Sequence, residues 1–330
     1  MNTISAVTER ETNFLRALAI LLMINSHLDN YYPISYLATG GMIGNSLFFM
    51  LSALGLYLSW QKRCTDRFGN WYSRRILRIY PAVWFSAILI LFPLAIHDGQ
   101  YRPDALLDYM GVFFYPPFPF WFLQSLMIFY IVLYFILKSY SNRLLVCVSA
   151  AAAVCYAVYY LFFLDLGSFS IEEHPFKLIF YFMVMLWGLY LASRIEHIRY
   201  TGFLDFVFLG LCILGIYGHK YLMYLGNLSS MQFVQQILIF PFLLYSLKVS
   251  QHNYISNVLM GNNHPLGKIL RFLSCITLEL YMVNFVLQNI FYKVMSFPWN
   301  LTLFLGVNIL LAVLIHYASI ETRRWLEKYL

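Results

Sequence analysis

The stretch NFLRALAILLMINSHLDNYY, residues 13–32, decides how the rest of the chain is interpreted. Its middle is an apolar run typical of a membrane helix, yet it carries Arg16 near one end and His27 near the other. Polar residues at helix ends are common in membrane proteins, because long side chains reach toward the interfaces. These two residues either anchor a span or also carry chemistry.

Composition indicates an integral membrane protein. Of the 330 residues, 61% are hydrophobic and only 11% are charged, whereas soluble domains hold about 25% charged residues. Aromatic residues make up 19%, which suits interfacial belts and packing between helices. The apolar segments are long runs rather than the alternating strands of a barrel, so we expect an all-α fold.

Ten apolar runs are long enough to cross about 30 Å of hydrocarbon. No soluble domain, linker or low-complexity tract separates them, so we expect one membrane-embedded domain over residues 1–330. The first run has no small-residue cleavage site and is expected to stay in the protein. The predicted spans are residues 14–33, 41–60, 79–96, 121–138, 144–163, 176–193, 202–219, 229–247, 270–292 and 299–319.

The distribution of positive charge predicts the orientation of this bundle. An even number of spans places both termini on one side, and that side receives 18 of the 22 Lys and Arg residues. The positive-inside bias then predicts cytoplasmic termini. It also accounts for the net charge of +7 without nucleic acid as a partner. The four on the other side are Arg102, Lys177, Lys220 and Lys293.

Several other kinds of site are not indicated. The five cysteines form no CxxC pair and no metal-ligand spacing, so we expect neither a disulfide framework nor a metal site. The sequence has no Walker A motif and no GxSxG, and none of its eight histidines begins an HxxxD motif. A nucleotide-driven motor, a serine esterase and a soluble HxxxD acyltransferase are therefore not indicated.

Helical geometry relates the two polar residues of the first span. Eleven residues turn through about 1100°, about 20° more than three turns, so Arg16 and His27 share one face if the helix continues. Their axial separation is about 16 Å. Asp29 lies about 200° around the helix from His27 and is badly placed to orient it. Two interfacial end residues would produce the same pattern.

An arginine segment, NWYSRRILRIYP at residues 70–81, precedes the third predicted span. Arg75 and Arg78 are three residues apart and so are neighbours on a helix face, with Arg74 beside them. Adjacent guanidinium groups suit phosphate. The alternatives are a positive-inside anchor or contact with anionic lipid head groups.

Two later spans also carry polar residues. In PFWFLQSLMIFY, residues 119–130, Trp121 marks an interface and Gln124 lies one turn further in. In ITLELYMVNF, residues 276–285, Glu279 sits inside an apolar span and Asn284 follows it. A carboxylate in a membrane is costly and normally faces a partner or a wet cavity, so its function can be catalytic or a helix-pairing contact.

With these residues in view, the chain resembles acyltransferase family 3, a family of membrane O-acyltransferases. The resemblance covers essentially the whole chain and is most specific in the first 80 residues. The family typically has ten spans with cytoplasmic ends and transfers acyl groups, often acetyl from acetyl-CoA, to surface glycans. The matching segments are NFLRALAILLMINSH (13–27), GNSLFFMLSALGLYLSW (44–60) and YSRRILRIYPAVWF (72–85).

The resemblance implies roles for particular residues. His27 is the expected catalytic residue with Arg16, and Arg74, Arg75 and Arg78 are expected to bind the acyl donor, acetyl-CoA. The implied acceptor is a lipid-linked or extracytoplasmic glycan such as the O-antigen of lipopolysaccharide or an exopolysaccharide. The implied location is a bacterial inner membrane, without an attached lipase-like domain. Trp121, Gln124, Glu279 and Asn284 are expected accessory polar residues.

Three positions depart from the family pattern. Ala53 stands where the second-span motif usually has glycine, Pro119 replaces a histidine before Trp-Phe-Leu, and Asn284 replaces a frequent histidine. These departures concern accessory groups and leave His27 and the arginines in place.

The sequence leaves the mechanism and two alternatives open. His27 is expected to act as a general base toward the acceptor hydroxyl, with Glu279 as a candidate partner, or to form an acyl-histidine. A non-enzymatic transporter of a small molecule or glycan is the alternative class, with Glu279, Asn284 and glutamines 232, 235 and 236 lining a polar path. Transfer of succinyl or a longer acyl group is the alternative within enzymes. No oligomeric state is indicated.

Overall fold

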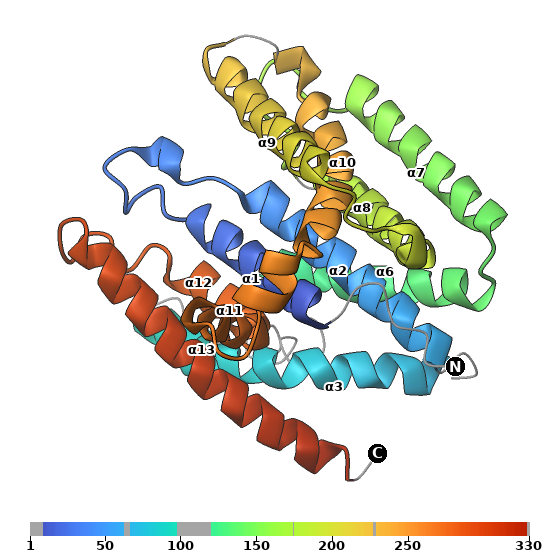
Figure 1. The fold of residues 1–330 in the computed structure, drawn as a ribbon. Helices are drawn as coiled ribbons and strands as arrows, with labels where there is room; N and C mark the ends of the chain where they lie inside the picture. Colours follow the sequence, from blue (N-terminus) through green and yellow to red (C-terminus); the bar gives the residue numbers. More distant parts are fainter. Residues whose placement is uncertain (1–8, 63–66, 98–119, 174, 227–228, 329–330) are drawn as a thin grey trace. The chain divides into compact units, whose positions relative to one another are not determined.

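The computed structural model describes residues 9–62, 67–97, 120–173, 175–226 and 229–328 (Figure 1). Within these ranges every regular element is a helix, which confirms the all-α prediction. Eight described helices are long and apolar enough to cross a membrane, or nine if the bent pair α11–α12 is one span. Helix α1 (Glu9–Asn25) has 17 residues and is not among them, so the count of ten spans stays a prediction. Cys64, Arg102 and Pro119 lie outside the described residues.

The chain divides into two compact units, and both include part of the N-terminal region. Helix α1 contributes its first residues to one unit and its last residues to the other. A single domain over residues 1–330 stays a prediction. The first unit is Met1–Ala19, Asn45–Cys64 and Leu133–Arg271, and the second is Ile20–Gly44, Thr65–Val132 and Phe272–Leu330.

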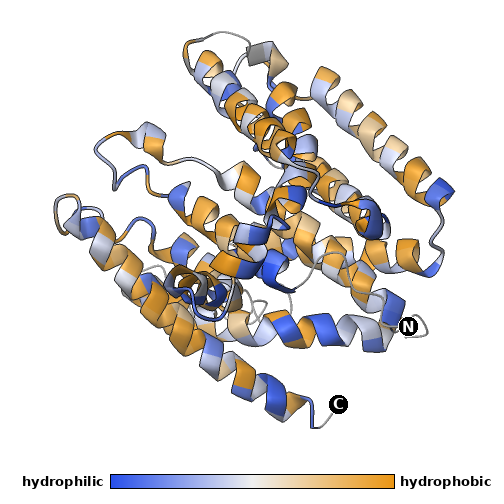
Figure 2. Ribbon diagram, in the orientation of Figure 1, coloured by the Kyte–Doolittle hydropathy of each residue, from blue (hydrophilic) through white to orange (hydrophobic). Residues whose placement is uncertain are grey.

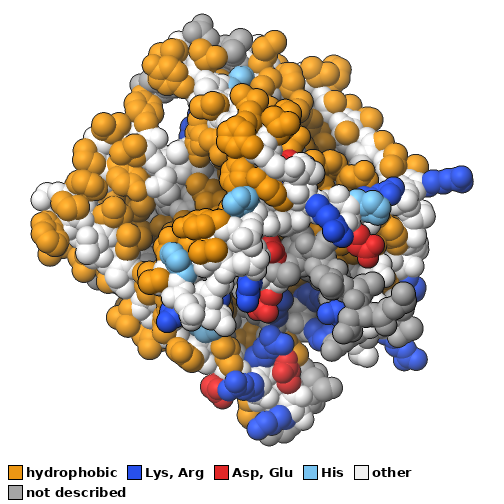
Figure 3. Space-filling view, in the orientation of Figure 1, with side chains coloured by type: hydrophobic (Ala, Val, Ile, Leu, Met, Phe, Trp, Pro, Cys, Tyr) orange, Lys and Arg blue, Asp and Glu red, His pale blue; other side chains and the backbone are white. Residues whose placement is uncertain are grey.

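In the first unit, α9 packs along α10, and α8 packs against both α7 and α10. Helices α2 and α8 come close together at Gly188, where an added Cβ would lie 2.8 Å from the carbonyl oxygen of Met50 and 3.1 Å from Cβ of Ala53. Ala53 is fully buried there, so Gly188 provides room beside the alanine. Hydrophobic side chains cover the visible side of α9 (Figure 3). The helices are α2 (Gly41–Lys62), α7 (Asn142–Phe162), α8 (Phe176–Ser193), α9 (Phe203–Tyr224) and α10 (Phe233–Ser250).

Buried glutamines beside the start of α10 hold the connection between α7 and α8. The side-chain oxygen of Gln232 accepts from the backbone N–H groups of Ser170 (2.9 Å) and Ile171 (3.3 Å), and its amide nitrogen donates to the carbonyl of Ser168. Gln236 accepts from the hydroxyl of Tyr156 at 2.6 Å and donates to the carbonyl of Ile171 at 3.3 Å. The two amides therefore satisfy buried backbone groups of a connection.

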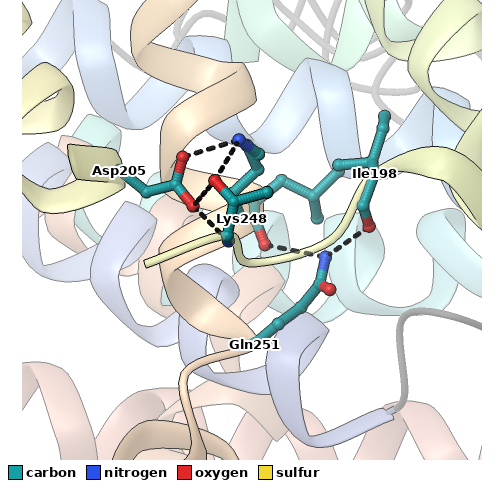
Figure 4. Close-up of polar contacts among 6 residues, drawn as sticks. Ile198, Asp205, Lys248 and Gln251 are labelled. Atoms are coloured by element: carbon teal, nitrogen blue, oxygen red, sulfur yellow. Dashed lines mark hydrogen bonds and ion pairs between the residues drawn. The ribbon is translucent and has the colours of Figure 1, made fainter. Parts of the chain in front are cut away.

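An ion pair joins the start of α9 to the end of α10 (Figure 4). Nζ of Lys248 lies 2.6 Å from Oδ1 of Asp205, whose side chain is only 2% exposed. The other carboxylate oxygen of Asp205 accepts from the backbone N–H and the hydroxyl of Thr201, at 2.6 and 2.9 Å. Nearby, Gln251 donates to the carbonyl of Ile198 at 3.0 Å. Asp205, in the first turn of α9, thus bonds to the residue before the helix N-cap and also has a cationic partner.

In the second unit, α3, α12 and α13 pack against one another in pairs. The buried positions of α13 recur every three or four residues, as expected for one helix face. Hydrophilic residues gather at the start of α3 and the end of α13, and the remaining turns of α13 are mostly hydrophobic (Figure 2). The helices are α3 (Phe68–Ser86), α4 (Phe92–His97), α12 (Thr277–Leu287) and α13 (Trp299–Leu326), with the first turns of α6 (Trp121–Lys138).

Several predicted spans have different bounds in the structure; α13, for example, continues to Leu326 instead of residue 319. Helix α1 ends at Asn25 instead of residue 33, because the Asn25 side chain bonds to the following loop. Helix α3 begins at Phe68 instead of residue 79. The arginine-bearing turns before residue 79 also favour a helix, although they are too polar to count as a membrane span. The ninth span bends by 75° between α11 (Pro265–Cys275) and α12, where Ile276 has non-helical dihedral angles.

Candidate active site

His27 lies in the turn that follows α1, and Asn25 shapes this turn. The amide nitrogen of Asn25 donates to the carbonyls of Leu37 (2.7 Å) and Thr39 (3.0 Å), and its oxygen accepts from the hydroxyl of Tyr32 at 2.7 Å. Short polar side chains that bond to nearby backbone compete with helix continuation. The shared face predicted for Arg16 and His27 therefore does not extend to His27, since the helix ends two residues before it.

The loop returns from this turn to α2 through Gly40. Its φ of +107° belongs to a region that side-chain-bearing residues rarely adopt. An added Cβ would also lie 3.0 Å from Cδ2 and 3.2 Å from the carbonyl oxygen of Leu22 on α1. Glycine therefore closes the loop against the helix that precedes His27.

The His27 ring is half-buried and lies against α12. Its centroid is 5.9 Å from the ring centroid of Phe285, with the planes nearly perpendicular. One residue before Phe285, the amide nitrogen of Asn284 lies 3.8 Å from the sulfur of Met23 on α1. Asp29 is exposed. The structure thus brings two of the predicted residues, His27 and Asn284, to the same end of α12.

Helix α12 meets several other elements of the second unit. The ring of Tyr281 lies 5.4 Å from Phe122 and 6.5 Å from Phe120, beside the start of α6. The hydroxyl of Ser86 on α3 lies 3.6 Å from the sulfur of Met282. Helix α12 also contacts α1 and α13. The elements around the candidate site therefore all pack against α12.

Glu279 pairs with a histidine from a distant part of the sequence. Its Oε1 atom lies 3.0 Å from Nδ1 of His316 on α13. Glu279 is 6% exposed, and its Oε2 atom is buried with no hydrogen-bond partner within the described ranges. Asn284 lies five residues further on, about 140° around α12, and its own Oδ1 atom is likewise buried without such a partner. The two accessory residues therefore face different neighbours.

The predicted arginines lie within α3, in the same unit as His27. The guanidinium carbon of Arg75 is 4.2 Å from the ring centroid of Trp71, and its Nη1 atom donates to the Trp71 carbonyl at 2.9 Å. This stacking fixes the stem of Arg75 on the buried tryptophan. Arg74 is half-buried like Arg75, whereas Arg78 is exposed.

Contacts with α6 hold the arginine-bearing turns of α3. The hydroxyl of Tyr72 donates to the carbonyl of Met127 at 3.3 Å, and the ring of Trp71 lies 6.3 Å from that of Tyr130. Trp121 and Gln124 occupy the first turn of α6, and both are half-buried. The helix that carries these two residues therefore packs against α3 as well as α12.

All predicted site residues except Arg16 belong to the second unit. Arg16 lies in the part of α1 assigned to the first unit and is half-buried. His316 lies 37 positions from Glu279, so the sequence gives no local signal for the pair. Among the described residues, no group of three or more His, Cys, Asp or Glu side chains is arranged to hold a metal ion.

Comparison with known proteins gives one match. A family model described as an acyltransferase domain, that of acyltransferase family 3, matches residues 10–317. No curated protein and no solved structure matches the chain. The family match spans both compact units and every candidate site residue.

Proposed function

The chain belongs to acyltransferase family 3, and from this membership in a family of multi-pass membrane acyltransferases we propose that it transfers an acetyl group from cytoplasmic acetyl-CoA to a glycan hydroxyl. The proposed acceptor is an extracytoplasmic or lipid-linked glycan, such as O-antigen or exopolysaccharide, at a bacterial inner membrane. The observation that carries the proposal is the presence of His27 and the three arginines of α3 in one compact unit.

The proposed donor site is the arginine-bearing start of α3. Arg75 and Arg78 are neighbours on the helix surface, and Arg74 is four residues from Arg78. Guanidinium groups bind phosphate oxygens through paired hydrogen bonds, which suits the phosphates of coenzyme A. The excess of Lys and Arg on the side of the termini supports a cytoplasmic position for this end of α3.

In the proposed reaction His27 is the general base. It removes the proton from the acceptor hydroxyl while the hydroxyl oxygen attacks the thioester carbonyl carbon. The tetrahedral intermediate then expels the coenzyme A thiolate, which takes up the proton from His27, so that the products are the ester and free thiol. A guanidinium or amide group beside the thioester carbonyl stabilises the oxyanion. Positioned proton transfer of this kind contributes about 10²–10⁴-fold.

The three glutamines at and just before the start of α10 give the transporter alternative no support. The glutamines expected to line its polar path bond to neighbouring groups: Gln232 and Gln236 hold the α7–α8 connection, and the Gln235 amide lies 3.2 Å from Nδ1 of His219. We therefore retain acyl transfer as the proposed function, with acetyl as its acyl group.

The test measures ester formation on surface glycan in cells that express the full chain. Wild type is compared with His27→Ala and Arg75→Ala, and ester-linked acetyl is released by mild base and quantified by mass spectrometry. The expected loss is about 10²-fold or more for His27→Ala. The matched controls are His197→Ala and Arg324→Ala, because both side chains are exposed and lie outside the site.

The outcomes separate the parts of the proposal. Folded, membrane-inserted alanine variants that acetylate at the wild-type level would overturn the site. A wild-type protein that adds succinyl or a longer acyl group would overturn the choice of acetyl alone. Accumulation of acyl-enzyme in the absence of acceptor would identify a covalent acyl-histidine instead of direct transfer.

A further inference from the structure

The pair of Glu279 and His316 leaves one carboxylate oxygen available inside the second unit. His316 occupies Oε1, while Oε2 is buried and has no donor in the described part of the chain. An unpartnered polar atom at membrane depth is costly, and ionisable residues there normally face a partner or a ligand path. The free oxygen therefore points to a ligand that brings a hydrogen-bond donor.

Glu279 begins a row of side chains that leads along α12 to His27. Residues at positions i, i+3 and i+6 form one ridge on a helix surface, and here these are Glu279, Met282 and Phe285. Glu279 contacts His316, Met282 contacts Ser86 of α3, and Phe285 contacts the ring of His27. From Glu279 to Phe285 the row rises by about 9 Å and winds by about 120° around α12.

The same row follows the helix that carries the proposed phosphate-binding arginines. Helix α3 packs against both α12 and α13, and its contact with the row is Ser86. Arg78 and Arg75 precede Ser86 on α3 by about 12 and about 16 Å of helix rise. A donor with its phosphates at these arginines and its thioester at His27 would therefore extend beside α3 toward α12.

The chemistry of the pantetheine arm matches the free oxygen. The arm has two amide N–H donors, and the second amide nitrogen is seven bonds from the thioester sulfur. Seven extended bonds span about 8–9 Å, since three backbone bonds span about 3.5 Å. With the sulfur beside His27, the second amide lies at the level of Glu279.

We propose that Glu279, held by His316, binds the pantetheine arm of the acyl donor by accepting a hydrogen bond from its second amide N–H. Glu279 then binds the acyl donor. His316 is a positioning residue, because its contact with Oε1 fixes the Glu279 carboxylate. The inference rests on the proposed use of acyl-CoA, and it adds a contact midway between the arginines and His27.

Two truncated acyl donors, which differ in whether they carry the second amide, test this contact separately from the rest of coenzyme A. Acetylpantetheine carries both amides, whereas S-acetyl-N-acetylcysteamine ends after the first, and neither carries the nucleotide. The full chain in membranes that contain acceptor is assayed by thiol release from each donor, with vector membranes subtracted. We expect Glu279→Met, which keeps the length but removes the acceptor, to lower kcat/KM for acetylpantetheine by about 10- to 100-fold. The same variant is expected to leave kcat/KM for S-acetyl-N-acetylcysteamine within about threefold of wild type.

Two further variants and a control distinguish binding from structure. Glu279→Gln keeps an acceptor oxygen and is expected to restore part of the preference for acetylpantetheine. His316→Ala is expected to show the same donor-selective loss, mainly in KM. The control is Asn300→Ala, another buried polar change on α13 whose amide bonds to Tyr292 and Leu301, and it is expected to affect both donors alike.

The outcomes keep this inference separate from the proposed function. An equal loss with both donors, or no loss with either, in folded Glu279→Met and His316→Ala overturns the pantetheine contact while acyl transfer stands. If the wild-type protein releases no thiol from acetyl-CoA above vector membranes, the proposed function itself fails. Selective loss with acetylpantetheine alone, with partial recovery in Glu279→Gln, supports the contact.

Discussion

Two groups of buried polar residues in this protein are built differently. In the first unit, Gln232 and Gln236 use both atoms of their amides on named partners, and Asp205 uses both oxygens on Thr201 and Lys248. In the second unit, Glu279 and Asn284 on α12 each keep one buried oxygen without a hydrogen-bond partner in the described residues.

The difference separates structural polar residues from candidate ligand contacts. A buried polar group whose hydrogen bonds are all made within the protein stabilises the fold and leaves nothing for a substrate. A buried oxygen without a donor is costly in the free protein and gains a partner when a ligand binds. Polarity inside a span is therefore a weaker guide to function than the presence of unused donors and acceptors. Substitutions in the two groups test this contrast.

The largest expected effect on stability follows from removing Lys248 in the first unit. Lys248→Met leaves the buried Asp205 carboxylate without its cation, although Thr201 still donates two hydrogen bonds. We expect the free energy of unfolding in detergent to fall by about 3 kcal/mol, because removing one partner strands a buried charge. Turnover per folded molecule should stay at the wild-type level.

The double variant Asp205→Asn, Lys248→Met is the matched control for this prediction. It removes both charges, and most of the lost stability should return. If Lys248→Met instead leaves stability unchanged and lowers turnover, the ion pair belongs to the functional group and the contrast between the units fails.

A somewhat smaller loss is expected for Gln232→Leu, which keeps the volume of the side chain but none of its hydrogen bonds. The backbone N–H groups of Ser170 and Ile171 then lose their acceptor inside the protein. We expect a loss of about 2 kcal/mol in unfolding free energy, and increased proteolysis between α7 and α8. Leu144→Ala serves as a comparison, since its side chain is only half-buried on α7. If Gln232→Leu instead loses acyl transfer without losing stability, the alternative that these glutamines line a polar path would be supported.

Much of the fold could be predicted from the sequence, because spans in lipid must be helical and apolar runs mark them. The arginines and His27 could be singled out because they lie within short motifs, and their roles stay predictions. Three features depend on contacts between distant residues and could not be predicted. Helix α1 ends where Asn25 bonds to Leu37 and Thr39, and Glu279 finds its partner 37 positions away. The bend at Ile276 likewise follows no proline or glycine signal.

The turn that holds His27 provides a further test of the difference between structural and functional polar residues. Asn25→Ala removes two donated hydrogen bonds and the acceptor for Tyr32, so that the loop after α1 loses its attachment. We expect turnover to fall about tenfold through misplacement of His27, with a loss of about 1 kcal/mol in stability. Tyr32→Phe is the control, because it removes only one of the three hydrogen bonds. Unchanged turnover in folded Asn25→Ala would show that His27 does not require this turn.

The smallest expected change in stability belongs to Asn284→Leu, at the end of α12 that adjoins His27. Among the described residues its Oδ1 atom has no hydrogen-bond partner, and its amide nitrogen contacts the sulfur of Met23 at 3.8 Å. Replacing such a group with an apolar side chain of similar size is close to neutral, so we expect stability to change by less than about 1 kcal/mol. Turnover should nevertheless fall severalfold, because a ligand that donates a hydrogen bond to Oδ1 of Asn284 would lose that bond in the variant. A marked loss of stability with turnover preserved would place Asn284 with the glutamines of α10, and unused hydrogen-bonding capacity would no longer distinguish the two groups of residues.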